Sequence, residues 1–338
     1  MRSARPNPHS LHPRHKRAND AGCRAHALSA ARLGAELLEA WIPITIAAAF
    51  CQNLRSVLQK QLTGKLSVGG ATATRFFFAM PFAIVYVAVL HLSFGMPLPK
   101  PSLVFFSWCI VGGLAQIVAT QLLVGLFAFR NFAVGTAYSK TETVQAALFG
   151  IVALHEVVSV GGAIAILVSL IGLFALSLAN ERITPTSLLS SITSAVARRG
   201  LASGSAFAVS AIAYRAASTS LGGSSYAMNA GFTLAWVTVL QTIAMWLWLA
   251  RKEPGETARM RGIWPQAMLV GFTGMLGSVG WFTAMTLQQV AYVRALGQIE
   301  LIFTFVSAAL WFRERVRPNE VVGVLLLVAG ILLLLLAR

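Results

Sequence analysis

The sequence predicts an all-α integral membrane protein with ten transmembrane helices, arranged as two inverted repeats of five helices each. Of its 338 residues, 57% are hydrophobic and 11% are charged, and the mean hydropathy is +0.71. A soluble domain of this length has too little interior to bury so much apolar surface. Apolar segments of about 20 residues, the length that crosses a hydrocarbon core, recur along the chain. The pattern of the first half also returns in the second half.

The apolar segments number five in each half. In the first half they are Trp41–Leu62, Thr74–Leu92, Val104–Phe127, Phe132–Leu154 and Gly162–Leu178. In the second half they are Leu201–Leu221, Tyr226–Ala250, Pro265–Leu287, Val290–Phe312 and Glu320–Leu336. These runs are too long for strands and lack the alternation of a membrane β-barrel, so we expect helices.

Four regions follow from this division. Residues 1–39 form a basic tail without the apolar run of a signal sequence, and we expect it to be disordered. Residues 40–179 form the first repeat, residues 180–200 a polar linker, and residues 201–338 the second repeat. Basic residues beside the spans favour termini outside the cell, whereas those of the tail favour the opposite, so the orientation stays open.

A segment that recurs 158 residues later is the strongest sign of duplication. This shift places Glu142 on Glu300 and Glu156 on Glu314, although only 11 residues of the chain are acidic. The same shift carries glycines onto glycines, at the positions Gly113 and Gly271, and Gly172 and Gly330. Because five is an odd number, two such copies must have opposite orientations. Inverted repeats are common in secondary transporters, whose substrate site lies between the repeats.

Glu142 and Glu300 are the strongest candidates for a functional pair. An ionisable side chain costs roughly 2.5–3.5 kcal/mol at the centre of a span, so it normally faces a protein cavity. A carboxyl group in a low dielectric can exchange protons near neutral pH, as a proton-coupled carrier requires. The alternative is a structural carboxylate neutralised by Lys140 or Arg294. Since Lys140 points to a different helix face from Glu142, the partner of Glu142 must come from another helix or the substrate.

Basic residues outnumber acidic ones inside the predicted spans. Arg55 and Arg215 form a second matched pair, offset by 160 residues. If they face a cavity, they predict a substrate with a carboxylate or phosphate, and if they lie at helix ends they do not. Arg75 lies near the start of a span, from which it can extend to lipid headgroups. Aromatic side chains within the spans could form the walls of a pocket, namely Tyr138, Tyr214, Trp236 and Trp281.

Small residues predict close helix packing in the eighth span. Gly271, Gly274, Gly277 and Gly280 recur at every third position. Helices in a membrane associate through such surfaces because no hydrophobic force drives them together.

The usual enzyme signatures are missing from the sequence. An HExxH pattern begins at His155, but Ser159 occupies the second ligand position, so zinc is not supported. No nucleophile elbow or Walker A sequence is present, and the three cysteines give neither a disulfide framework nor metal-ligand spacing. We expect no enzyme activity and no cofactor, and any driving force would be an ion or solute gradient.

Both copies resemble the second half of an EamA repeat of the drug/metabolite transporter superfamily. That family pattern has an acidic residue, an apolar run of about a dozen residues, Gly-Glu and a Gly-rich final helix. Here it reads TETVQAALFGIVALHEVVSVGGAIAILVSLIGLF and IELIFTFVSAALWFRERVRPNEVVGVLLLVAGILL. The chain departs from the family at its frequent proline, replaced by Thr143 and Leu301. It departs again at the glycine, replaced by His155 and Arg313.

The resemblance, over about residues 41–337, implies a ten-helix carrier whose relatives move amino acids, other small metabolites or drugs, often outward. We therefore expect a multi-pass transporter of the inner or plasma membrane that exports a small polar solute by alternating access. Its expected partners are that solute, the lipid bilayer and protons as candidate coupling ions, without nucleic acid. The expected contacts are Glu142 and Glu300 for coupling or substrate, Arg55, Lys140 and Arg215 for an anionic group, and Tyr138 and Trp281 for the walls. Glu156 and Glu314 fall at helix ends and are expected to be structural.

The alternative is a membrane protein that binds a partner or scrambles lipid without transporting a solute. Long apolar grooves open to lipid would favour this alternative, and a closed polar cavity would favour solute transport. The sequence leaves the substrate and the oligomeric state undetermined.

Overall fold

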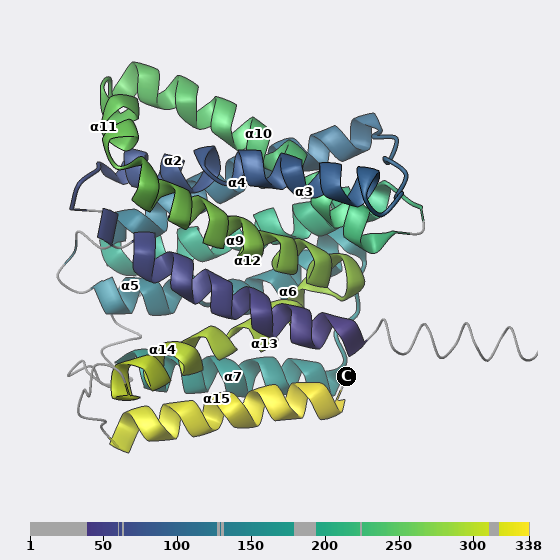
Figure 1. Cartoon of the computed structure of the whole chain (residues 1–338). Helices are drawn as coiled ribbons and strands as arrows, with labels where there is room; N and C mark the ends of the chain where they lie inside the picture. Colours follow the sequence, from purple (N-terminus) through teal and green to yellow (C-terminus); the bar gives the residue numbers. More distant parts are fainter. Residues whose placement is uncertain are drawn as a thin grey trace, which may run out of the picture. The chain divides into compact units, whose positions relative to one another are not determined.

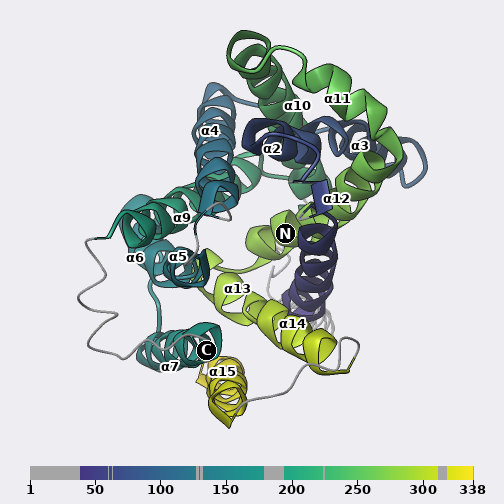
Figure 2. The same cartoon turned by 90° about the vertical axis from the view of Figure 1, so that its left-hand side faces the viewer.

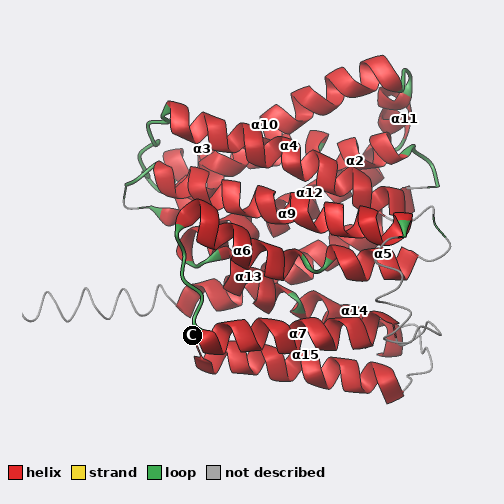
Figure 3. Cartoon of the chain, turned by 180° about the vertical axis from the view of Figure 1, so that it is seen from behind, coloured by secondary structure: helices red, strands yellow, loops and turns green. Residues whose placement is uncertain are grey.

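The computed structural model describes residues 39–59, 61–62, 64–126, 129, 132–178, 194–223, 225–310 and 318–337. These ranges contain helices and the turns between them, and no strand (Figure 3). The chain divides into two units, Met1–Ala40 and Trp41–Arg338, and the fold described below is that of the second unit. The predicted basic tail lies almost entirely outside the described residues.

In the first half, each predicted span falls on a helix or on a pair of consecutive helices. The helices are residues 41–59, α2 (Val68–Phe77), α3 (Met80–Leu92), α4 (Leu103–Leu126), α5 (Phe132–Ser139), α6 (Glu142–Leu154) and α7 (Val160–Leu178). The helix of residues 41–59 is called the first helix below.

The helices of the second half are α9 (Ala195–Ser220), α10 (Tyr226–Lys252), α11 (Glu256–Gly262), α12 (Trp264–Leu287), α13 (Val290–Gly297), α14 (Ile299–Leu310) and α15 (Pro318–Ala337). Here the second span is one continuous helix, α10, and a short helix, α11, precedes the third span. The helix α9 begins at Ala195, before the predicted end of the linker at residue 200. Ser194 caps α9, because its hydroxyl accepts a hydrogen bond from the amide of Ala197 at 3.1 Å.

Three of the predicted spans are interrupted. Pro81 lies in the first turn of α3 and has no amide to continue the hydrogen-bond ladder of α2, so the chain turns at residues 78–79. The other two breaks lie between α5 and α6, at residues 140–141, and between α13 and α14, at Gln298. These two are at corresponding places in the two halves.

Within the described residues, five segments are long and apolar enough to cross a membrane, judged by length and composition. They are Val68–Leu92, Leu103–Leu126, Tyr226–Lys252, Trp264–Leu287 and Pro318–Ala337. Large apolar side chains on the outside of these helices are exposed, for example Leu103 and Leu325. An apolar exterior of this kind belongs to an integral membrane protein. The full count of ten spans and the inverted orientation stay predictions.

Helices of one half pack against helices of the other. The pairs in contact are α4 with α9, α3 with α10, α6 with α13, and α7 with α15. Figures 1 and 2 show α7 and α15 side by side. Glycines matched by the 158-residue shift lie at this last interface. A Cβ atom on Gly172 would be 2.5 Å from the amide nitrogen of Leu327, and one on Gly330 would be 2.6 Å from that of Ser169.

The glycine surface predicted in the eighth span is confirmed. It places α12 against the first helix and the turn between α2 and α3. A Cβ atom on Gly280 would lie 2.7 Å from the Cβ atom of Ala48, and one on Gly271 would lie under 3.0 Å from the backbone of Phe78. Since real Cβ atoms do not approach that closely, only glycine permits this packing.

Candidate functional site

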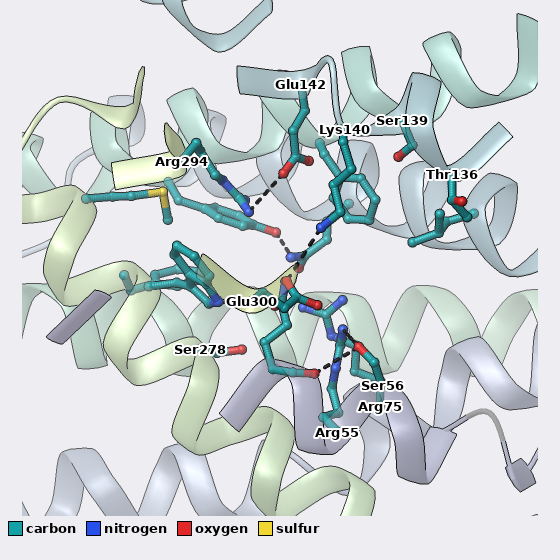
Figure 4. Close-up of a pocket in the computed structure, with 18 residues that line it drawn as sticks. Arg55, Ser56, Arg75, Thr136, Ser139, Lys140, Glu142, Ser278, Arg294 and Glu300 are labelled. Carbon is teal, nitrogen blue, oxygen red and sulfur yellow. Dashed lines mark hydrogen bonds and ion pairs between the residues drawn. The ribbon is translucent and has the colours of Figure 1, made fainter. Parts of the chain in front are cut away.

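A polar cavity of about 160 Å³ lies where the broken helices of the two halves meet. Its lining comes from the first helix, α2, α4, α9 and α12, and from the breaks between α5 and α6 and between α13 and α14. Among the described residues, six charged side chains line it: Arg55, Arg75, Lys140, Glu142, Arg294 and Glu300 (Figure 4). Four of these are cations and two are carboxylates.

Two ion pairs cross the cavity from one half to the other. Lys140 Nζ lies 3.5 Å from Glu300 Oε2, and Arg294 Nη1 lies 3.5 Å from Glu142 Oε1. Each pair joins a residue of the α5–α6 region to one of the α13–α14 region. The partner of Glu142 is thus on another helix, as the different helix faces of Lys140 and Glu142 predict. Both distances exceed the roughly 2.7–2.9 Å of a tight charge-assisted hydrogen bond, so the pairs are loosely held.

Gln52 and Trp281 connect this charged network to the first helix and α12. Gln52 Nε2 donates a hydrogen bond to Glu300 Oε2 at 3.3 Å, and Gln52 Oε1 accepts one from Trp281 Nε1 at 3.1 Å. The guanidinium of Arg294 lies 5.1 Å from the centroid of the Trp281 ring, within the range of a cation–π interaction. Gly297 makes room for this ring, since a Cβ atom there would lie under 3.0 Å from it.

Arg55 and Arg75 line the cavity without a carboxylate partner among the described residues. Both residues are buried, each with 8% of its surface exposed. Arg55 Nη2 donates to the hydroxyl of Ser56 at 3.3 Å, and its buried Nε–H has no hydrogen-bond acceptor in the described part of the chain. The guanidinium of Arg75 lies 5.6 Å from the centroid of the Phe76 ring. Glu300 is near enough to attract Arg55, but its carboxylate pairs with Lys140. Neither buried arginine therefore forms an ion pair with a carboxylate of the described residues.

Of the predicted site residues, Glu142, Glu300, Arg55, Lys140 and Trp281 line the cavity, whereas Arg215 and Tyr138 do not. Arg215 Nε pairs with the carboxylate of Glu156, and Nη1 donates to the carbonyl oxygen of Gln288 at 2.7 Å. Relative to the 158-residue shift, Arg215 lies two positions beyond the equivalent of Arg55. Two positions turn a helical side chain by about 200°, so the two arginines face different ways.

Tyr138, predicted for the wall of the site, and Glu156, predicted to be structural, both lie outside the cavity lining. Tyr138 is buried against Phe174, with the ring centroids 5.9 Å apart in an edge-to-face arrangement. Glu156 lies just after α6 and is the counterion of Arg215. Glu314 lies outside the described residues.

Arg75 is the main cavity residue that sequence reasoning missed. The predicted span began at Thr74, which placed Arg75 at a helix end and near headgroups. Instead α2 begins at Val68, so Arg75 lies in its last turn, next to the break before α3. The signal for the earlier start is Ser67, whose hydroxyl caps the helix by accepting from the amide of Gly70 at 2.9 Å. Gln52, Ser56 and Ser278 also line the cavity and carry no comparable sequence signal.

Neutral polar groups close one side of the cavity. The hydroxyl of Tyr214 on α9 donates to Oε1 of Gln116 on α4 at 2.9 Å. The same oxygen accepts from Nε2 of Gln241 on α10 at 2.8 Å. This buried network holds three helices together and leaves Tyr214 and Gln116 in the lining.

The fold and the cavity define an all-helical membrane protein with a charged polar site between its two halves. Residues 200–336 match the family model of the EamA-like transporter family, so the EamA-type resemblance is confirmed over the second half. A solved structure described as "Crystal structure of protein" is similar in fold, with a TM-score of 0.64 and 16% sequence identity. That similarity covers 89% of this chain and 99% of the other. Among curated proteins, no sequence matches this chain.

Proposed function

We propose that this protein is a secondary transporter that exports a small polar solute across the cell membrane by alternating access. The observation that carries the proposal is the polar cavity between the two halves, crossed by ion pairs that connect their broken helices. Inverted repeats in secondary transporters place the substrate at such an interface, beside interrupted helices. The match of residues 200–336 to the model of the EamA-like transporter family supports the same class.

The ion pairs give the cavity a means of responding to a bound ion. Neutralising Glu142 would free Arg294, and neutralising Glu300 would free Lys140, because each carboxylate holds the cation of the other half. A proton on either carboxylate would therefore loosen one contact between the halves. We assign Glu142 and Glu300 to coupling on this basis, and alternating access to a rocking of the halves about the cavity.

Lipid scrambling is supported less well by the surface of the described helices. Two surface grooves lie beside α10, one against α3 and one against α4. Their linings are almost entirely apolar, for example Ile84, Trp236 and Ile243. A lipid headgroup moving along these grooves would have few polar side chains to contact, whereas the cavity is lined by charged side chains. The grooves suit lipid tails, and the cavity suits a polar solute.

The test uses purified protein in liposomes that contain a pH-sensitive dye. Amino acids, organic anions and lipophilic cations are added outside, and wild type is compared with Glu142→Gln/Glu300→Gln. The proposal predicts solute-triggered proton movement that the double variant loses. Glu320→Gln, at the start of α15 and outside the cavity, is the matched control and should behave as wild type.

If no solute moves protons, radiolabelled uptake decides between an uncoupled carrier and a protein that does not transport. Uptake without proton movement would remove coupling from the proposal. If no solute of the panel is taken up and fluorescent lipids exchange between leaflets, the transport proposal fails in favour of scrambling.

A further inference from the structure

We propose that Arg55 and Arg75 form a binding subsite for an oxyanion, a carboxylate or phosphate group, so that the solute is a small organic anion. This inference rests on the proposed transport function, because it concerns the same cavity. The cavity would then select solutes that carry a carboxylate or phosphate group, and Arg75 would bind that group together with Arg55.

The charges of the cavity are the first reason. Lys140 and Arg294 are matched by Glu300 and Glu142, one carboxylate to one cation. Arg215, the other arginine predicted to contact an anion, is matched by Glu156 outside the cavity. Among the described lining residues, cations thus exceed carboxylates by two, and Arg55 and Arg75 are the cations without an ion pair (Figure 4). Glu300 attracts Arg55 as well, but one carboxylate cannot neutralise both Arg55 and Lys140.

The burial of these two arginines is the second reason. A buried ion without a counterion is strongly destabilising, since it has lost its hydration and gained no partner. Arg75 also lies close enough to Arg55 and Arg294 for their like charges to act on it. An oxyanion bound beside both side chains would offset the repulsion and could accept a hydrogen bond from the buried Nε–H of Arg55. Because a guanidinium presents a planar fork of N–H groups, two arginines suit the oxygens of a carboxylate or phosphate.

The helices hold both arginines in place. Gly274 of α12 leaves room for the side chain of Arg55, since a Cβ atom there would lie 3.2 Å from Arg55 Cδ. The helix that carries Arg75 is fixed at its start, where the amide of Ser67 donates to Glu256 Oε2 at 3.2 Å. The hydroxyl of Ser67 also donates to the carboxylate of Glu253. A subsite built on anchored helices is preorganised for its ligand.

The size and lining of the cavity set the rest of the solute. A volume of about 160 Å³ is smaller than the roughly 300–1,000 Å³ of pockets for drug-sized ligands, so the solute is small. Trp281 and Phe282 offer apolar contacts to its carbon skeleton, and Ser278 and Gln116 offer hydrogen bonds. Lipophilic cations fit this cavity poorly, because they would meet its net positive charge.

The experiment measures binding to the purified full-length protein by the shift of its thermal unfolding midpoint. The probes are succinate for the carboxylate arm, glycerol 3-phosphate for the phosphate arm, and succinamide, glycerol and choline as neutral or cationic controls. Wild type should be stabilised by at least one anion in a saturable way, and by none of the controls. The arm that stabilises more strongly identifies the preferred oxyanion.

The variants Arg55→Gln and Arg75→Gln should each weaken this anion binding by roughly tenfold or more, because each removes a hydrogen-bonded charge. Arg55→Lys and Arg75→Lys keep the positive charge but lose the planar guanidinium, so they should weaken anion binding less. They also serve where a glutamine variant fails to fold. Arg251→Gln, at the exposed end of α10, is the matched control and should bind as wild type.

Two results would overturn the subsite: no saturable stabilisation of wild type by either anion, or anion binding that is unchanged in both the Arg55 and the Arg75 variants. Failure of the transport proposal would look different. Arginine-dependent anion binding without any flux in liposomes would keep the subsite and reject transport. If neither anion binds in an arginine-dependent way but an uncharged solute is transported in dependence on Glu142 and Glu300, the subsite fails and the transport proposal stands.

Discussion

His155 shows how one side chain can occupy a backbone position that favours glycine. It follows the last residue of α6 with φ of 53°, in the left-handed region, where the EamA-type pattern has glycine. A side chain in that region raises the free energy of the folded state by roughly 1–2 kcal/mol. Glycine avoids this cost, but part of the gain is offset because glycine also increases the conformational entropy of the unfolded chain.

Replacing His155 by glycine should therefore stabilise the protein by up to about 1 kcal/mol. Thermal unfolding in detergent measures this as a higher midpoint than that of wild type. His155→Ala keeps the Cβ atom and is the control, for which no increase is expected. An unchanged or lower midpoint for His155→Gly would show that the imidazole makes a contact worth more than the backbone strain.

The crossed ion pairs make a second prediction about single side chains. Arg294→Gln leaves the buried carboxylate of Glu142 without its partner, which costs up to about 3–5 kcal/mol. Arg294→Gln/Glu142→Gln removes both charges, so it should unfold at a higher temperature than Arg294→Gln alone. A double-mutant cycle on thermal unfolding measures the coupling. Strictly additive losses would mean that the two side chains do not interact.

The sequence indicated which side chains are unusual but not which of them meet. Glu142, Glu300 and Lys140 stand out because they interrupt apolar runs. Their pairing depends on how the two halves interlock, which no local pattern contains. The match with Arg55 predicts that Arg215 faces the cavity. Arg215 instead lies two positions beyond the equivalent of Arg55, so its side chain faces another way and pairs with Glu156.

Helices were predictable from the same sequence because apolar segments of membrane length are strong signals. Each predicted span falls on a helix or helix pair within the described residues. The breaks at residues 140–141 and at Gln298 were not predicted, because the residues there are tolerated inside helices. Pro81 does indicate the break between α2 and α3, but it lies in the middle of an apolar run that predicts one continuous span.

Helix packing at α12 depends on the absence of a side chain at Gly271. A Cβ atom there would collide with the backbone of Phe78, which cannot move aside as a flexible side chain can. Gly271→Ala should destabilise the protein by about 1–3 kcal/mol, the usual cost of overpacking. Thermal unfolding checks this against Gly125→Ala in α4, which has no neighbouring atom within 4 Å of the added methyl group. Equal midpoints for the two variants would contradict the assigned packing.

Residues of both halves line the cavity, so neither half forms it alone. Contact between the corresponding helices α7 and α15 agrees with a duplicated architecture. The sequence predicts duplication because acidic residues are rare and two of them recur at one spacing. The charge of the cavity was only partly visible, since the contribution of Arg75 depended on where α2 begins.

Access to the cavity from both sides of the membrane is the central claim of this account. Ser278 lines the cavity, so Ser278→Cys introduces a thiol there with little change in size. The variant is made in a background without Cys23, Cys51 and Cys109 and placed in sealed liposomes with mixed orientation. A membrane-impermeant thiol reagent is then added outside only.

Ala258→Cys, on an exposed position of α11, is the control, and it should react only in the molecules that present α11 outward. Alternating access predicts that Ser278→Cys reacts in every molecule, whichever way it faces. Labelling of Ser278→Cys confined to one orientation, or absent from both, would contradict the claim that the cavity opens to each side in turn.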